Sequence, residues 1–255
     1  MDNIAITLDV DWTPDFVIDR VAELLLAAGT PATWFITHSS PALERLRTHP
    51  GLFELGVHPN FMSGSTQGST PEAVLEHVMA LVPEAVSMRT HALVQSTPLF
   101  SRVVHQTPLI NDVSLFLPYA SHLQPALFRV AGSTLTRLPF FWSDVQEMAQ
   151  PQPAWSLAER WLEKPGLKIF TFHPIHIALN SRRGAAYTAL KQRVRRLDQA
   201  TPQDLDDLVE SGPGARQGFL NLLDCLAGEA RLQTVRQIAQ DWREAQHHQE
   251  FMVKD

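Results

Sequence analysis

Apolar and polar positions follow two different periods over the first 58 residues and predict the order strand, helix, strand, helix, strand. Residues 4–8 form a short apolar run with β-branched side chains, which is typical of a strand buried on both faces. Residues 16–28 place apolar side chains on one helical face, and that helix is expected to stop at Gly29. Strands are expected at 32–37 and 52–58, with a short helix at 41–48 between them. This order favours parallel strands with crossover helices, whose ligand sites gather at the carboxyl ends of the strands.

The pattern continues with shorter elements and ends in helices. The loop 59–70 is long, polar and glycine-containing, as functional or mobile loops often are. The expected elements after it are a helix at 71–81, a strand at 86–88, a helix at 97–105, short strands within 108–141, a helix at 156–163, a strand at 167–172, and helices at 184–197, 215–227 and 234–246. An acidic connector is expected at 201–210, and a frayed tail at 247–255.

Composition narrows the class of protein. A chain of 255 residues with 44% hydrophobic residues is expected to form one domain over residues 1–255. The net charge of −6 gives no general attraction to nucleic acid. Cys225 has no second cysteine to pair with, and its apolar helical surroundings predict a place in the core. There is neither a leader pattern nor an apolar run long enough for a transmembrane segment, so a cytoplasmic location is expected.

Two carboxylates follow the first predicted strand. Because strand side chains alternate with a period of two, Asp9 and Asp11 are expected to point to the same side. Like charges roughly 6–7 Å apart on one strand repel each other, and burial would raise one pKa unless a cation lies near. The pair therefore indicates a metal ion, a catalytic base or both. The alternative is that one carboxylate caps the next helix and the other is solvated.

Imidazole and guanidinium groups stand at the ends of the later strands. They are His58, Arg89, His91, His173 and His176. Imidazole nitrogen and carboxylate oxygen are ligands of zinc and similar ions, and catalytic zinc sites keep one position open for water. Such an ion acidifies the water, a second carboxylate can take its proton, and a histidine can protonate the leaving group. These groups meet the requirements for hydrolysing an amide or ester, although a structural histidine at 58 and an ordinary ion pair at 89 are alternatives.

The motifs and their order resemble a known family. Thr7-Leu8-Asp9-Val10-Asp11 resembles the Thr-Phe-Asp-Asp-Gly motif of polysaccharide deacetylases, the NodB-homology proteins of carbohydrate esterase family 4. Further resemblances follow in order at residues 32–36, 54–58, 89–91 and 169–173. The His-Pro-Asn-Phe sequence at 58–61 is closest to a WbmS-like branch associated with O-antigen biosynthesis. The resemblance implies an α/β fold, a distorted (β/α) barrel of about seven strands over about residues 3–176, with extra helices over about 184–246.

The resemblance also implies catalytic roles. By position, Asp9 would be the general base, Arg89 the partner of that base, and His173 the general acid. Asp144 falls near a family motif whose acid tunes the base or the acid. Asp9, Arg89 and His173 are the candidate catalytic groups.

The metal site departs from the family pattern. The resemblance implies His58 and Asp11 as ligands, the latter displaced by the inserted Val10. The second family histidine lies four residues after the first, but here that position is Met62, and thioethers suit softer ions. His91 is expected as the third ligand, with His176 in reserve. The expected ion is zinc, with cobalt or nickel as alternatives.

The function implied is removal of an N-acetyl or other acyl group from a sugar during assembly of a surface polysaccharide. The expected substrate contacts are Asn60, Trp12, Asp144 and His176, and further aromatic residues that could stack on a sugar are Phe61, Phe141 and Trp142. The basic stretch 182–196 is either a solvated helix face or a contact for the diphosphate of a nucleotide-linked or lipid-linked sugar. Two other functions stay open: a catalytically silent carbohydrate-binding protein, and a hydrolase of non-sugar amides.

Overall fold

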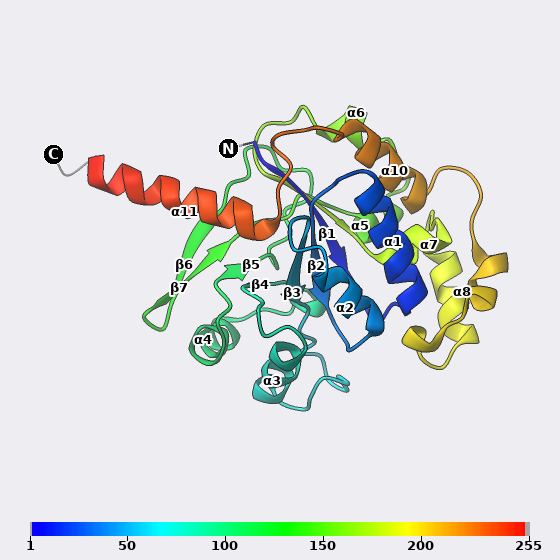
Figure 1. Cartoon of the computed structure of the whole chain (residues 1–255), viewed down its shortest axis with the longest axis horizontal. Coiled ribbons are helices and arrows are strands. Elements are labelled where there is room, and N and C mark those ends of the chain that lie inside the picture. Colours follow the sequence, from blue (N-terminus) through cyan, green and yellow to red (C-terminus); the bar gives the residue numbers. More distant parts are fainter. Residues whose placement is uncertain (1, 253–255) are drawn as a thin grey trace.

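The computed structural model of the chain describes residues 2–252, with side chains up to residue 246. Among these residues the strands form one nine-stranded sheet in the order β6-β7-β5-β4-β3-β2-β1-β9-β8 (Figure 1). Neighbouring strands are parallel except for the antiparallel pair β6 and β7. The strands are β1 Ile4–Asp9, β2 Ala32–Ile36, β3 Phe53–Val57, β4 Ser87–Met88, β5 Asn111–Asp112, β6 Ala126–Val130, β7 Ser133–Arg137, β8 Trp142–Ser143 and β9 Lys168–Phe172.

Helices cover the sheet on its outer side. α1 packs against α2 and α7, α7 packs against α10, and α3 packs against α4 (Figure 1). The helices are α1 Asp15–Ala27, α2 Pro41–Arg47, α3 Pro71–Leu81, α4 Thr97–Gln106, α5 Asp144–Met148, α6 Leu157–Trp161, α7 Pro174–Leu179, α8 Ala185–Arg193, α9 Pro202–Leu205, α10 Ala215–Cys225 and α11 Val235–Met252, with short 3₁₀ turns η1 His91–Leu93, η2 Leu197–Gln199 and η3 Asp206–Leu208. No helix within residues 2–252 is both long and apolar enough to cross a lipid bilayer.

The sheet curls strongly enough to bring separated strands together. Arg89 follows β4, yet its Nη1 donates hydrogen bonds to Thr7 Oγ1 at 2.9 Å and to Asp9 Oδ1 at 2.7 Å on β1. Because β2 and β3 lie between β4 and β1 in the sheet, these contacts cross the concave interior. The fold is therefore an α/β half-barrel, which confirms the distorted (β/α) barrel that the resemblance implied, with nine strands among the described residues where about seven were expected.

A polar cluster closes the amino-terminal end of this interior. Glu54 is buried, and its carboxylate accepts hydrogen bonds from Thr33 Oγ1 at 2.8 Å and from Ser87 Oγ at 2.5 Å. The first turn of α11 joins the cluster, because the backbone N–H of Arg236 donates to Glu54 at 2.8 Å and that of Val235 donates to Thr33 Oγ1 at 3.0 Å. From this anchor α11 runs past β6 and β7 and away from the body (Figure 1). The opposite, carboxyl-terminal end stays open.

Most of the expected elements are present, and several expectations were wrong. The helix at 71–81 and the parallel order of the first strands are confirmed. The connector 201–210 contains α9 and η3, because Thr201 and Asp204 form a capping box that starts a helix. Cys225 is exposed, since it lies on the outer side of α10. Residues 173–176 were expected at a strand end, but Pro174 starts α7 there. The tail predicted to fray is helical up to Met252, and residues 253–255 lie outside the described part.

Candidate metal and catalytic site

A cavity of about 320 Å³ opens at the carboxyl ends of the strands. Five candidate residues line it: Asp9, Asp11, His58, His91 and His173. The structure thus brings together carboxylates and imidazoles that lie up to 164 positions apart in the chain. The lining also includes apolar side chains and further polar ones: Ala92, Leu93, Phe116, Phe140 and Val145, and Thr90, Ser143, Gln146 and Thr171.

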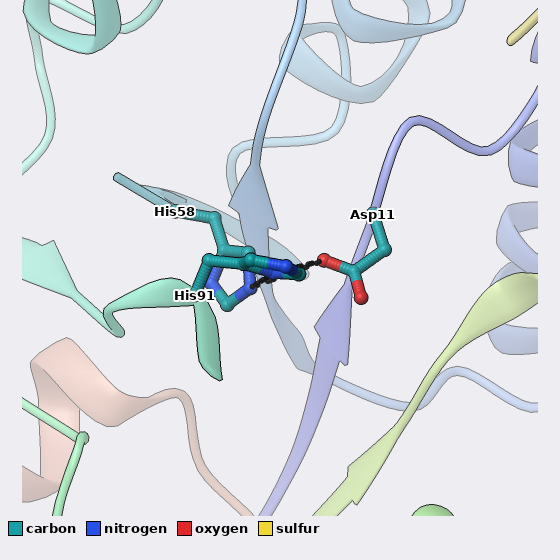
Figure 2. Close-up of side chains that lie close together, drawn as sticks. All are labelled: Asp11, His58 and His91. Carbon is teal, nitrogen blue, oxygen red and sulfur yellow. Dashed lines mark hydrogen bonds and ion pairs between the residues drawn. The ribbon is translucent and has the colours of Figure 1, made fainter. Parts of the chain in front are cut away.

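Asp11, His58 and His91 form a cluster with the spacing of metal ligands (Figure 2). Asp11 Oδ1 lies 3.2 Å from His58 Nε2 and 3.0 Å from His91 Nδ1, and the two nitrogens are 3.4 Å apart. Ligand atoms about 2.0–2.1 Å from a tetrahedral zinc ion are separated by about 3.3 Å. The donor set and its spacing therefore fit a divalent ion of the zinc type.

The carboxyl group of Asp11 is held in its ionised form. Burial alone would raise the pKa of this carboxyl group, but hydrogen bonds with His58 and His91 outweigh burial and hold the pKa well below its ordinary value. A buried anion beside two imidazoles attracts a cation. The negative charge of Asp11 and the spacing of the three ligand atoms therefore both favour a bound cation.

Asp11 reaches the cluster through a tight turn and not along the strand. β1 ends at Asp9, and Asp11 and Trp12 have φ angles of 46° and 54°, in the left-handed region. The turn is fixed by hydrogen bonds from Val10 N–H to the Phe35 carbonyl and from Trp12 N–H to Thr37 Oγ1. The expectation that strand alternation relates Asp9 and Asp11 was therefore wrong, although both line the same cavity.

His91 is presented by a second strained turn. Ala92 and Leu93 have φ angles of 53° and 55° within η1, and both line the cavity. The backbone N–H of His91 donates to the Pro59 carbonyl at 2.9 Å, which ties this turn to the segment after His58. Non-glycine residues in this region cost about 1–3 kcal/mol each and concentrate at functional sites. Backbone strain is thus stored at two turns that supply ligands of the same cluster.

Asp9 is fixed by Arg89. The Arg89 side chain is 1% exposed, and besides its bond to Asp9 its Nε donates to the Val113 carbonyl at 3.1 Å. The guanidinium group lies between the rings of Phe35 and Phe140, with its central carbon 4.7 Å and 4.5 Å from the ring centroids. Such stacking suits the planar guanidinium group and keeps water away from the ion pair. Asp9 Oδ1 is therefore occupied, while Asp9 also lines the cavity.

His173 lies close to the carboxylates of Asp9 and Asp11 in the cavity. Its Nδ1 lies 2.7 Å from Asp144 Oδ1, and its Nε2 lies 3.9 Å from Asp9 Oδ2 and 3.6 Å from Asp11 Oδ2. Burial would lower the pKa of His173, but the carboxylates of Asp144, Asp11 and Asp9 outweigh burial and raise it to about 10. The ring is therefore protonated at neutral pH.

The remaining candidates lie away from the catalytic cavity. Asp144 is fully buried beneath His173, and His176 is 4% exposed, with its Nδ1 3.0 Å from Ser181 Oγ. Burial lowers the pKa of His176 to about 4, so it is a neutral, packed side chain. Trp12 and Asn60 line a neighbouring cavity. Met62 is 50% exposed, on the loop that the sequence predicted to be functional or mobile.

The aromatic residues of the cavity were not found from the sequence. Phe141 and Trp142 are buried in the core, at 1% and 0% exposure, so the expectation that they stack on a sugar was wrong. Phe116 and Phe140 line the cavity instead, with their rings stacked at 4.3 Å. Both belong to the region 108–141, in which the pattern did not delimit the strands, and only a correct strand register would have identified them.

Comparison with family models identifies one family for most of the chain. The family model for the WbmS-like polysaccharide deacetylases matches residues 6–191. The chain belongs to this family. The match includes the two carboxylates at the end of β1 and His173 after β9. None of the curated protein sequences matches the chain.

One solved structure shows the same family, and two more distant ones share the fold. WbmS from Bordetella bronchiseptica, assigned as a polysaccharide deacetylase involved in O-antigen biosynthesis, is 31% identical, with a TM-score of 0.74 over 88% of this chain and 90% of that one. The peptidoglycan deacetylase PdaC from Bacillus subtilis shares the fold at 15% identity, with a TM-score of 0.51 over 98% of this chain and 96% of that one. The 4-α-glucanotransferase from Thermococcus litoralis is 10% identical, with a TM-score of 0.56, and 93% of this chain covers 38% of that one.

Proposed function

We propose that the protein is a metal-dependent hydrolase that removes an N-acetyl or other acyl group from a sugar. The observation that carries the proposal is the juxtaposition, in one cavity, of the Asp11, His58 and His91 cluster with Asp9 and His173. Family membership and the O-antigen role of the 31% identical relative support a substrate from surface polysaccharide assembly. The substrate sugar would be nucleotide-linked or lipid-linked.

The ligands of the proposed ion are Asp11, His58 and His91. Zinc suits this set of one oxygen and two nitrogen donors, with cobalt or nickel as alternatives. When bound, a divalent ion lowers the pKa of a water molecule and polarises the carbonyl group of the substrate. The three protein ligands leave room for such small groups on the cavity side.

Asp9 is the proposed general base. Its Oδ1 is held by Arg89, so Oδ2 is the oxygen that can accept a proton from the attacking water. Because the Arg89 guanidinium is clamped between two aromatic rings and bonded to the Val113 carbonyl, the carboxylate of Asp9 has a fixed position. Arg89 thus positions the base without contacting the substrate.

His173 is the proposed general acid. Its Nδ1 is engaged by Asp144, which leaves the Nε2 proton, on the cavity side, for the departing amine nitrogen. The carboxylates of Asp144, Asp11 and Asp9 raise the pKa of His173 and so favour retention of that proton. The apolar lining residues, among them Phe116 and Phe140, would keep bulk water away from the reacting amide.

The direct test is release of acetate from N-acetylated sugars by the zinc-loaded protein and by Asp9→Asn. We expect turnover by the wild type and a loss of about 10²–10⁴-fold in the variant, with the circular dichroism spectrum unchanged. Full activity of Asp9→Asn would contradict the assigned base.

The same assay separates the two alternatives. Saccharide binding without turnover at any metal concentration would indicate a silent carbohydrate-binding protein. Turnover of small linear or cyclic amides, with no turnover of acetylated sugars, would indicate a hydrolase of non-sugar amides.

A further inference from the structure

The basic stretch 182–196 is not one uniform surface. Arg193 and Arg196, towards its end, are each paired with an aspartate, so their positive charges are compensated within the chain. Arg182 and Arg183, at its start, have no carboxylate partner for their side chains among the described residues. The start of the stretch, just before α8, therefore carries uncompensated positive charge.

Arg182 and Arg183 line a cavity of about 560 Å³, which we call the Arg182 cavity. The Arg183 guanidinium group donates to the carbonyl oxygens of Gln150 at 3.2 Å and Pro151 at 2.6 Å, which fix its position without neutralising it. Within the described part of the chain, Arg182 is held only through its backbone N–H, which donates to Glu210 Oε2 at 2.8 Å. Because two guanidinium groups face one carboxylate, that of Glu210, the lining keeps a net positive charge.

α8 begins at the same cavity. Ala185, its first residue, belongs to the lining, and Gly184 before it has a φ angle of 79° and no side chain that could cap the helix. The backbone N–H groups of Ala185, Ala186 and Tyr187 have no acceptor among the described residues. Such N–H groups and the positive end of the helix dipole attract anions, phosphate groups among them.

A buried side chain supplies a further donor. Trp155 lines the cavity and is 5% exposed, and its indole N–H has no acceptor in the described part of the chain. Since this N–H is also not one of the fully buried polar groups that lack a partner, it is accessible to a ligand. The ring is fixed by Trp142, with centroids 6.3 Å apart, and by Gly218, where an added Cβ atom would lie 3.1 Å from it. A rigid, unpaired donor at a positively charged cavity suits an anionic ligand.

We propose that the Arg182 cavity binds a phosphate or diphosphate group. A phosphate presents acceptor oxygens on several sides, which matches donors that come from two guanidinium groups, a helix start and an indole ring. A carboxylate has two oxygens in one plane and would leave part of these donors unpaired. The Arg182 cavity shares no lining residue with the catalytic cavity, so this site is independent of the proposed hydrolysis.

The test is NMR titration of the zinc-loaded protein with inorganic phosphate and with UDP. The chain has six tryptophans, and Trp155→Phe identifies the indole N–H signal of Trp155 among them. We expect this signal to shift with a saturable dependence on either probe. The signal of Trp12, which packs against the ring of the metal-site residue His91, reports separately on any binding at the metal.

Arg182→Ala is the most specific variant, because the Arg182 side chain has no partner to lose within the described part of the chain. It should weaken the affinity for phosphate and UDP about tenfold or more, since a charge-assisted hydrogen bond is removed. Arg183→Ala should have a similar effect, although it also releases the carbonyl groups of Gln150 and Pro151. Arg193→Ala is the matched control: it removes the same charge from α8, but Arg193 does not line the cavity. It should leave the affinity within about twofold.

Vesicles distinguish a soluble phosphate compound from a lipid headgroup. Co-sedimentation with phosphatidylcholine vesicles that contain phosphatidylglycerol, lost in Arg182→Ala, would assign the site to a lipid phosphate. A shift of the Trp155 signal by UDP or phosphate, without vesicle binding, would assign it to a soluble compound. The inference would be overturned if neither probe shifted the Trp155 signal and no vesicles were bound, or if Arg182→Ala bound every probe as tightly as the wild type.

Discussion

Asp144 holds His173 at two points. Its Oδ2 accepts the backbone N–H of His173 at 2.7 Å, and its Oδ1 lies 2.7 Å from the imidazole Nδ1. One carboxylate thus fixes both the start of α7 and the orientation of the ring. Burial would raise the pKa of Asp144, but the charge of His173 and its hydrogen bonds keep the pKa below its ordinary value.

Replacing Asp144 with Asn tests this coupling. In the metal-free protein we expect the pKa of His173 to fall from about 10 by more than one unit, because a neutral amide neither attracts the imidazolium charge nor accepts its bond as strongly. Activity of the zinc-loaded variant should fall about 10- to 100-fold. NMR titration of the His173 ring measures the first effect and acetate release the second. Asp207→Asn, at an exposed carboxylate, is the control, and an unchanged titration of His173 in Asp144→Asn would refute the coupling.

Because His176 is buried, the free energy of unfolding is expected to fall in mild acid. Its pKa is lowered by burial from 6.5 to about 4, so between these values the unfolded chain binds more protons than the folded protein. The stabilisation is complete above pH 6.5 and is lost as the pH falls towards 4. The loss should reach roughly 3 kcal/mol of the free energy of unfolding.

The measurement for His176 is urea unfolding at pH 7 and at pH 4. The wild type should lose more stability between these pH values than His176→Gln, whose amide can still bond to Ser181 but does not titrate. The exposed His105→Gln serves as the control and should follow the wild type. Equal losses in His176→Gln and in the wild type would show that His176 does not cause the acid sensitivity.

Gly56 is expected to be required for the packing of the Phe35 ring against the Arg89 guanidinium group. A Cβ atom added at Gly56 would lie 2.7 Å from the Ser87 carbonyl oxygen and 2.9 Å from the ring of Phe35, one of the two rings that cover the guanidinium group. Gly56→Ala should lower the free energy of unfolding by about 1–3 kcal/mol and reduce turnover, because Phe35 must move.

Gly51→Ala is the matched control for Gly56. No atom lies within 4 Å of an added Cβ at this position, so its effect should stay within about 0.5 kcal/mol. Denaturant unfolding of both variants provides the comparison. A Gly56→Ala protein as stable and active as Gly51→Ala would mean that Arg89 does not need the Phe35 ring in its present position.

The sequence predicts the regular part of the molecule well for a physical reason. β1 is buried on both faces and α3 begins with Thr70 and Pro71, so apolar runs and helix starts identify them locally. The two-residue strands β4, β5 and β8 have too few residues for any pattern, and their place is set by pairing with neighbours. For the same reason the cavity residues Phe116 and Phe140 were missed.

The site was predictable in its residue types but not in its geometry. Asp9, Asp11, His58, His91 and His173 line one cavity because parallel strands end at one edge, which the alternation of strands and helices predicts. The left-handed turns that aim Asp11 and His91 carry no glycine, so the sequence gives no sign of them. The placement of His176 depended on Pro174, which starts a helix where an extended strand end was expected.

The metal content of the purified protein tests the central claim most directly. We predict about one equivalent of a divalent ion in the wild type after loading with zinc, and loss of that ion in both His58→Ala and His91→Ala, because each removes one of three ligands. The exposed His105→Ala should retain the ion. A wild type that takes up no zinc, cobalt or nickel, or a His91→Ala protein that binds metal as tightly as the wild type, would contradict the proposed site.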